Sequence, residues 1–205
     1  MTILLADPVV RAVRVLENGD PLVPLDFASH VLVREGLAQR LIEARAALPS
    51  GVDLRVIEGH RSIADQSAII ERYTDELREL HPLADKAELD RLSSRFVAPL
   101  AVAPHVAGAA VDLTLVDAAG DELWMGTVVD ATPEQSDGAC FFNAEVDAEA
   151  RRNRTVLADA LSGAGLVNYP TEWWHWSYGD RYWALLTQAD HAVYGAVEVP
   201  AWARS

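Results

Sequence analysis

Cysteine is almost absent from this chain of 205 residues, in which Cys140 is the only one. A single cysteine excludes an intrachain disulfide and favours a reducing compartment. The chain is long enough to bury a sizeable core, and half of its residues are hydrophobic. No repeat or low-complexity block divides the sequence. We therefore expect one domain over residues 1–205.

Basic residues are also scarce. Lys and Arg number 17 against 31 Asp and Glu, which gives a formal net charge of −14. Nucleic acids and anionic membrane surfaces are bound by clustered Lys and Arg. The composition therefore predicts that neither is a partner, and it identifies no other partner.

Long apolar runs are missing as well. The longest uncharged stretch, residues 96–111, is shorter than the roughly 20 residues of a membrane-spanning helix, and it contains Pro99 and Pro104. The first residues reach Asp7 and Pro8 with no basic segment before an apolar run, which argues against a secretory signal peptide. These observations predict a soluble, cytoplasmic protein.

Helical spacing is clear in the first half of the chain. Apolar residues recur on one face of a helix that ends at the PSG stretch 49–51: Leu37, Leu41, Ala44 and Leu48. Residues 53–58 (DLRVIE) are typical of a strand. Ser62 and Asp65 resemble a capping box, and the helix that follows must end before Pro82. A second, short helix is expected over 84–95.

The sequence patterns in the second half of the chain predict more strands. Residues 110–116 are expected to form a strand, and residues 117–122 the turn of a hairpin. Residues 125–143 read as a long loop, a feature that is often functional in compact domains. A last long helix can end at Gly163, and strands are expected in LVNYP and TEWWHWS. Because helices and mostly antiparallel strands come in blocks, the predicted class is α+β.

Two of the six histidines stand in contexts that suit metal binding. His105 precedes Asp112, a carboxylate in an otherwise apolar strand, which needs a strong partner such as a cation. His175 lies in the tryptophan-rich EWWHW. Two histidines and one carboxylate complete the three-ligand set of a catalytic zinc site, which leaves the fourth position for water. Glu172 is then free to take a proton from that water.

The spacing of Glu172 and His175 raises a geometric difficulty. Residues i and i+3 of a regular strand point to opposite faces, so both side chains cannot approach one metal from an ideal strand. We therefore expect a bulge, a turn, or a position for Glu172 at the strand entry, and Pro170 favours the last of these.

These motifs resemble the zinc D,D-peptidases of peptidase family M15, and more narrowly the D-alanyl-D-alanine dipeptidases of the VanX type. Residues 105–112 match His-x-x-Gly-x-Ala-x-Asp, and residues 172–175 match Glu-x-x-His. EGHRS, GAAVDLTL, MGTVVD and EWWHW occur in the same order as in those dipeptidases. The resemblance covers about residues 31–184.

The resemblance implies a hedgehog/D,D-peptidase fold, a small α+β domain with one zinc ion in a cleft of a mostly antiparallel sheet. It implies hydrolysis of a small D,D-dipeptide, most simply D-Ala-D-Ala. The implied zinc ligands are His105, Asp112 and His175, with Glu172 as the general base. The further implied roles are stabilisation of the oxyanion by Arg61 and binding of the substrate's ammonium group by Asp130.

One position departs from the family pattern. Ala103 stands where the family usually has a serine that helps to bind the substrate's amino end, so the dipeptide preference stays open. Two alternatives also remain: a D,D-carboxypeptidase or endolysin-type wall peptidase, and a zinc-binding interaction domain without catalysis. The presence of Glu172 and Arg61 favours catalysis. Oligomeric state and physiological role (glycopeptide resistance, wall recycling or nutrition) are not predicted.

Overall fold

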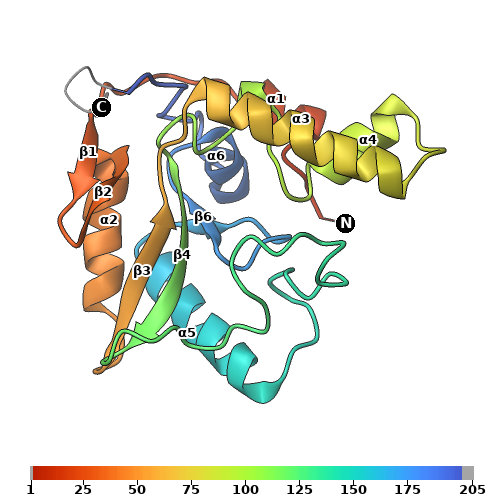
Figure 1. The fold of residues 1–205 in the computed structure, drawn as a ribbon. Helices are drawn as coiled ribbons and strands as arrows, with labels where there is room; N and C mark the ends of the chain where they lie inside the picture. The colour runs from red at the N-terminus through yellow and green to blue at the C-terminus, as the bar shows by residue number, and fades with distance from the viewer. Residues whose placement is uncertain (1, 200–205) are drawn as a thin grey trace.

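A four-stranded antiparallel sheet in the order β3-β4-β6-β5 lies at the centre of the computed structural model, which describes residues 2–199 (Figure 1). Its strands are β3 (Val52–Glu58), β4 (Ala110–Asp117), β5 (Val167–Asn168) and β6 (His175–Ser177). A separate antiparallel hairpin is formed by β1 (Leu22–Leu25) and β2 (Ala28–Arg34). The α+β class is confirmed.

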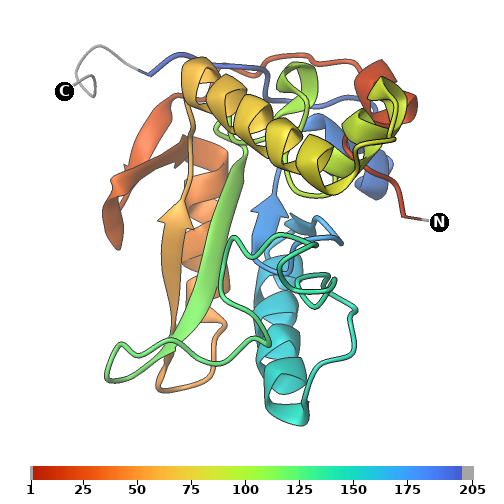
Figure 2. The ribbon, with the colours of Figure 1, turned by 45° about the vertical axis from the view of Figure 1, so that its right-hand side comes forward.

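Helices cover the sheet on one side and cross its upper end. Helices α2 (Glu35–Ala46) and α5 (Ala148–Gly163) share the main core with β3 and β4. Helix α3 (Ile63–Leu80) and helix α4 (Lys86–Ser93) lie across the top in Figure 2. The remaining helical elements are short: α1 (Pro8–Ala12), α6 (Arg181–Thr187) and a 3-10 turn at Leu100–Val102. No helix within residues 2–199 has the length and apolar content needed to cross a bilayer.

Most of the predicted elements are confirmed within about two residues. The Ser62 hydroxyl accepts the Asp65 amide at 3.0 Å and caps α3, as the capping pattern predicted. The stretch 125–143 contains neither helix nor strand. The hairpin β1–β2 and helix α6 were not predicted. Residue 1 and residues 200–205 of the predicted domain lie outside the described residues.

The register of β4 and β6 sets up the site. Every residue of β4 except Asp117 is buried, because this strand is covered on both faces. Asp112 of β4 pairs directly with His175 of β6. In an antiparallel pair, opposite residues carry their side chains on the same face about 5 Å apart. A carboxylate and an imidazole are thereby held side by side within the core.

The expected strand over TEWWHWS is correct only for its last part. Strand β6 begins at His175, and the preceding residues form a turn in which the His175 amide donates to the Glu172 carbonyl at 3.3 Å. The Asn168 side chain holds this turn by donating to the carbonyls of Glu172 at 2.9 Å and His175 at 3.0 Å. A turn is one of the solutions expected for the Glu-x-x-His spacing, and it removes the geometric difficulty.

Candidate metal centre

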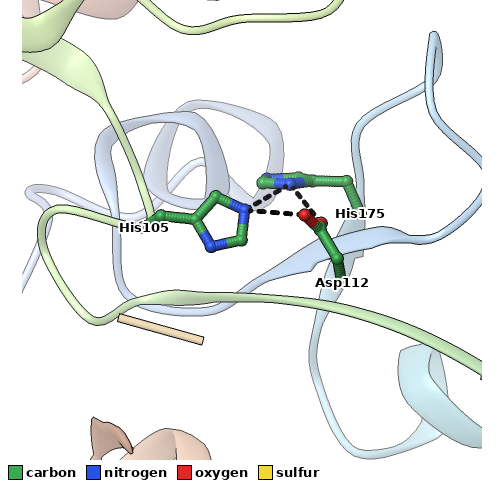
Figure 3. Close-up of side chains that lie close together, drawn as sticks. All are labelled: His105, Asp112 and His175. Atoms are coloured by element: carbon green, nitrogen blue, oxygen red, sulfur yellow. Dashed lines mark hydrogen bonds and ion pairs between the residues drawn. The ribbon is translucent and has the colours of Figure 1, made fainter. Parts of the chain in front are cut away.

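Three buried side chains converge on one point (Figure 3). Nδ1 of His175 lies 3.0 Å from Oδ1 of Asp112, and Nε2 of His105 lies 3.1 Å from Nδ1 of His175. Nε2 of His105 is also 3.3 Å from Oδ2 of Asp112. The described residues thus contain a His-Asp-His group that could hold a metal ion.

The donor set fits a zinc ion. Tetrahedral zinc with bonds of about 2.0–2.2 Å separates its ligand atoms by about 3.3–3.5 Å, close to the distances observed. Nδ1 of His105 lies 2.7 Å from the Gly59 carbonyl, so a neutral ring donates there and directs the Nε2 lone pair inward. Two imidazole nitrogens and one carboxylate oxygen then face each other, an arrangement that needs a cation between them.

Burial and neighbouring charges shift the pKa values of these three groups in opposite directions. Burial raises the pKa of Asp112, but the neighbouring His105 and His175 outweigh it and hold that pKa below its usual range. Burial lowers the pKa of His105, but the charge of Asp112 outweighs it, and the net shift is upward. At His175 burial prevails and the pKa is lowered. Asp112 is therefore a carboxylate, as a metal ligand must be.

Glu172 lies beside the three convergent side chains without joining them. The residue is buried at 5% exposure, and its Oε2 is 3.8 Å from Nδ1 of His175. No hydrogen bond to its carboxyl group is formed by the described residues. Burial, followed by the charges of Asp112 and Asp130, raises the pKa of Glu172 well above its ordinary value. A free carboxyl group with a raised pKa is suited to proton transfer.

Arg61 is held rigidly at the same site. Its Nε donates to Oε1 of Glu58 at 2.7 Å, and its Nη2 donates to Oε2 of the same carboxylate. Its Nη1 donates to Oε1 of Gln66 at 2.9 Å, and Gln66 is anchored in turn on the Ala98 carbonyl at 2.8 Å. A guanidinium carries five N–H groups. Within the described part of the chain two of them remain free for a ligand.

All of these groups line one cavity of about 310 Å³. Its walls include Arg61, Asp130, Glu172 and the three convergent side chains. The volume is at the lower end of the range for ligand pockets, about 300–1,000 Å³. The cavity therefore suits a small molecule.

Asp130 belongs to the stretch 125–143, which we call the Asp130 loop (teal in Figure 2). Its backbone is left-handed, with φ of 62°, a conformation that costs a non-glycine residue energy and is common at functional sites. The residue is exposed at the edge of the cavity. Partial desolvation, followed by the charges of Asp112 and Glu58, raises the pKa of Asp130 to about 6.

The base of the Asp130 loop is closed by one buried arginine on α5. Arg154 donates from Nε to the Met125 carbonyl at 2.7 Å and from Nη2 to the Ala139 carbonyl at 2.8 Å. Its Nη1 donates to the carbonyls of Phe141 at 2.6 Å and Phe142 at 3.2 Å. Burial lowers the pKa of Arg154 to about 10. Both ends of the loop are thus fixed to one side chain.

The middle of the loop is attached to α3 and to Arg95, which follows α4. Glu134 accepts a hydrogen bond from the Tyr73 hydroxyl of α3 at 2.6 Å and another from Nη2 of Arg95. Trp173, next to Glu172, donates its indole N–H to the Thr127 hydroxyl at 2.8 Å. Asp130 is therefore carried by a segment that is anchored on both sides.

Removing the Tyr73 hydroxyl is expected to loosen this segment. Tyr73→Phe deletes a hydrogen bond to a carboxylate, so it should destabilise the protein by about 1–2 kcal/mol and speed amide exchange over residues 130–136. Hydrogen exchange and thermal unfolding measure both effects. Tyr182→Phe is the matched control, since it removes a hydroxyl bonded to the Ile3 carbonyl at 3.2 Å. Faster loop exchange in both variants would contradict the assignment.

All of the predicted site residues except Ala103 line the cavity. They are Arg61, His105, Asp112, Asp130, Glu172 and His175. Ala103 is different, because it is buried and lines a separate small hollow with Asp180 and Tyr194. The structure does not bring it to the cavity.

Sequence reasoning missed four residues that support the site. Arg154 carries no sequence signal, because its partners are main-chain carbonyls. Tyr73 is buried on α3, where an aromatic residue is most simply part of the core, and its partner Glu134 lies in a loop. Gln66 lies five residues after Arg61, on the buried side of α3. A polar residue at a core position of a helix is the one signal that could have identified it.

Three side chains that could hold a metal ion, a free carboxyl group and an arginine lie around one small cavity, and metal-dependent hydrolases use such an arrangement. The family model for D-ala-D-ala dipeptidases, Peptidase M15, matches residues 23–193. The chain therefore belongs to this family of metallopeptidases, which confirms the family predicted from the motifs.

Three individual proteins are similar to this chain. A D-alanyl-D-alanine dipeptidase of Synechocystis sp. is 25% identical over 246 residues, which cover 91% of this chain and 96% of that protein. A D-alanyl-D-alanine dipeptidase of Escherichia coli is 39% identical over 71 residues, 35% of each chain. The crystal structure of the vancomycin resistance D,D-dipeptidase VanXYg in complex with a D-Ala-D-Ala phosphinate analogue is 16% identical. It has a TM-score of 0.41 and covers 88% of this chain and 69% of that one.

Proposed function

We propose that this protein hydrolyses a small D,D-dipeptide, most simply D-Ala-D-Ala, with one zinc ion bound by His105, Asp112 and His175. The convergence of these three side chains, with donor atoms 3.0–3.3 Å apart, is the observation that supports the proposal best. When bound, zinc would lower the pKa of a coordinated water to about 7 and polarise the substrate's carbonyl group.

Glu172 acts as the general base. It lies close enough to the metal ligands to accept a proton from the attacking water, and it makes no competing hydrogen bond with the described residues. Its raised pKa favours holding that proton until the amine departs and can receive it. The buried surroundings exclude bulk water and strengthen these interactions.

Arg61 and Asp130 bind the two charges that the reaction presents. The two free N–H groups of Arg61 stabilise the negative oxygen that develops on the carbonyl, while Glu58 and Gln66 hold the guanidinium in place. Asp130 accepts the substrate's ammonium group. That group's positive charge stabilises the carboxylate form of Asp130, whose pKa is otherwise raised.

A metal analysis combined with a mass-spectrometric screen of D,D-, L,D- and L,L-dipeptides tests the proposal. We expect about one zinc ion per chain and selective cleavage of D,D-dipeptides. N-acylated D-Ala-D-Ala belongs in the screen, because faster cleavage of the acylated form would identify a D,D-carboxypeptidase or a wall peptidase instead. Zinc binding without cleavage of any dipeptide would identify a non-catalytic domain.

Chelation and acidification should both abolish activity. Zinc binds only deprotonated ligands, so protons compete with the metal as the pH falls, first at His105, whose pKa is raised. Turnover should therefore decline on acidification and return when zinc is restored at neutral pH. Thermal unfolding over the same pH range separates metal loss from unfolding. Full turnover in protein shown to be free of metal would contradict the proposal.

A further inference from the structure

The cavity extends beyond the metal centre along α3. Gln66, which holds Arg61, marks the inner end, and Ile69, Arg72 and Glu76 continue the wall toward the outer end. Ten residues of helix from Gln66 to Glu76 span about 15 Å. An extended dipeptide spans at most about 7 Å, so the metal centre and the proposed ammonium site do not account for the whole cavity.

The charges along this cavity are unbalanced. Its walls carry five carboxyl groups against the two arginines, Arg61 and Arg72: Glu58, Glu76, Asp112, Asp130 and Glu172. The charge of Arg61 is paired with Glu58, and its two free N–H groups are those proposed above to bind the developing oxyanion. A ligand with a carboxylate would be repelled by most of this surface, and it needs a cation that is still available.

Arg72 is such a cation. Its side chain is exposed to the cavity, and its guanidinium makes no hydrogen bond or ion pair with any residue in 2–199. Glu76 lies one turn further on the same wall but forms no ion pair with it. Arg72 is six residues beyond Gln66, about 9 Å along the helix axis. This offset is about 2 Å longer than an extended dipeptide, a difference that the long side chain of Arg72 can cover, so the two ends of such a ligand can reach different sites.

We propose that Arg72 binds the C-terminal carboxylate of the dipeptide and thereby selects substrates with a free carboxyl end. The inference rests on the proposed dipeptidase function and adds the second terminal-group site. Asp130 then binds the ammonium end and Arg72 the carboxylate end, with the peptide bond between them at the metal. An unpaired guanidinium is well suited to this task, because its planar fork matches a carboxylate in a two-point contact.

A pair of substrates tests this assignment. D-Ala-D-Ala and its C-terminal amide differ only at the group that Arg72 would bind. Wild-type protein should prefer the free acid, and Arg72→Gln should lower the ratio of kcat/KM for the acid over the amide by about fivefold to tenfold. This is below the usual range for a hydrogen bond to a charged group, because Arg72 is solvent-exposed. Arg72→Lys, which keeps the charge, should recover part of the ratio.

Arg78→Gln is the matched control. Arg78 lies on the same helix and is exposed, but it is paired with Asp75 and does not line the cavity. Its substitution should leave the ratio as in wild type. An unchanged acid-to-amide ratio in Arg72→Gln, or an equal change in Arg78→Gln, overturns the assignment while the dipeptidase function stands. If wild-type protein loaded with zinc cleaves neither substrate, the proposed function itself fails, and this inference fails with it.

Discussion

Glu172→Gln is expected to keep about one zinc ion per chain while turnover falls by 10²–10⁴, the usual cost of losing a general base. The amide keeps the size and buried position of the carboxyl group but cannot accept the proton of the attacking water. Zinc binding should be little affected, because His105, Asp112 and His175 already provide three ligand atoms. Zinc content, thermal unfolding and turnover are measured on the same preparation.

His175→Ala provides the contrast. The two positions are three residues apart in one turn and are equally buried, so a general packing defect would affect both alike. His175→Ala should lose zinc and activity together, since it removes a ligand that also faces Asp112 at 3.0 Å. If Glu172→Gln also empties the metal site, or keeps turnover near that of wild type, our assignment of base and ligand is wrong.

Arg61→Lys is expected to lower kcat by about 10²–10³ with zinc content unchanged. Lysine keeps the positive charge near Glu58, but a single ammonium group cannot bind that carboxylate at two points, reach Gln66 and still donate to the developing oxyanion. The loss should be in kcat rather than KM, because the oxyanion exists only in the transition state.

Arg55→Lys controls for the exchange of an arginine by itself. Arg55 lies on β3 and is exposed, with Glu122 as its partner at 3.1 Å, outside the cavity. Turnover by this variant should match that of wild type. A kcat of Arg61→Lys within about threefold of wild type, with zinc bound, would show that Arg61 does not stabilise the transition state; oxyanion donors normally contribute far more.

The three side chains that converge in the cavity could be predicted because their surroundings in the sequence carry physical information. Asp112 is a charged residue among the buried, mostly apolar residues of its strand, a position that is costly without a cation. His175 was conspicuous for the same reason among the buried tryptophans of its segment. Helices α2, α3 and α5 were predictable from apolar periodicity and capping residues, which are local in the sequence.

The parts that could not be predicted depend on distant contacts. The pairing of Asp112 with His175 joins residues 63 positions apart, and no local pattern fixes such a register. The turn before β6 is stabilised by the side chain of Asn168, which overrides the strand preference of the aromatic residues. Helix α6 is short, and its Asp180 cap is buried, so tertiary packing decides whether it forms.

The hydrogen bonds between Arg154 and the Asp130 loop affect which mutations the loop can accept during evolution. Its guanidinium binds four main-chain carbonyl oxygens, and a carbonyl is present whatever the side chain. Residues between those anchor points can therefore be exchanged by mutation without releasing the loop ends. Loop positions whose side chains make no anchoring contact can accept new side chains at little cost in stability, as antibody loops do on a constant framework. Changes of substrate preference should accumulate between residues 126 and 138, while Arg154 itself stays the same.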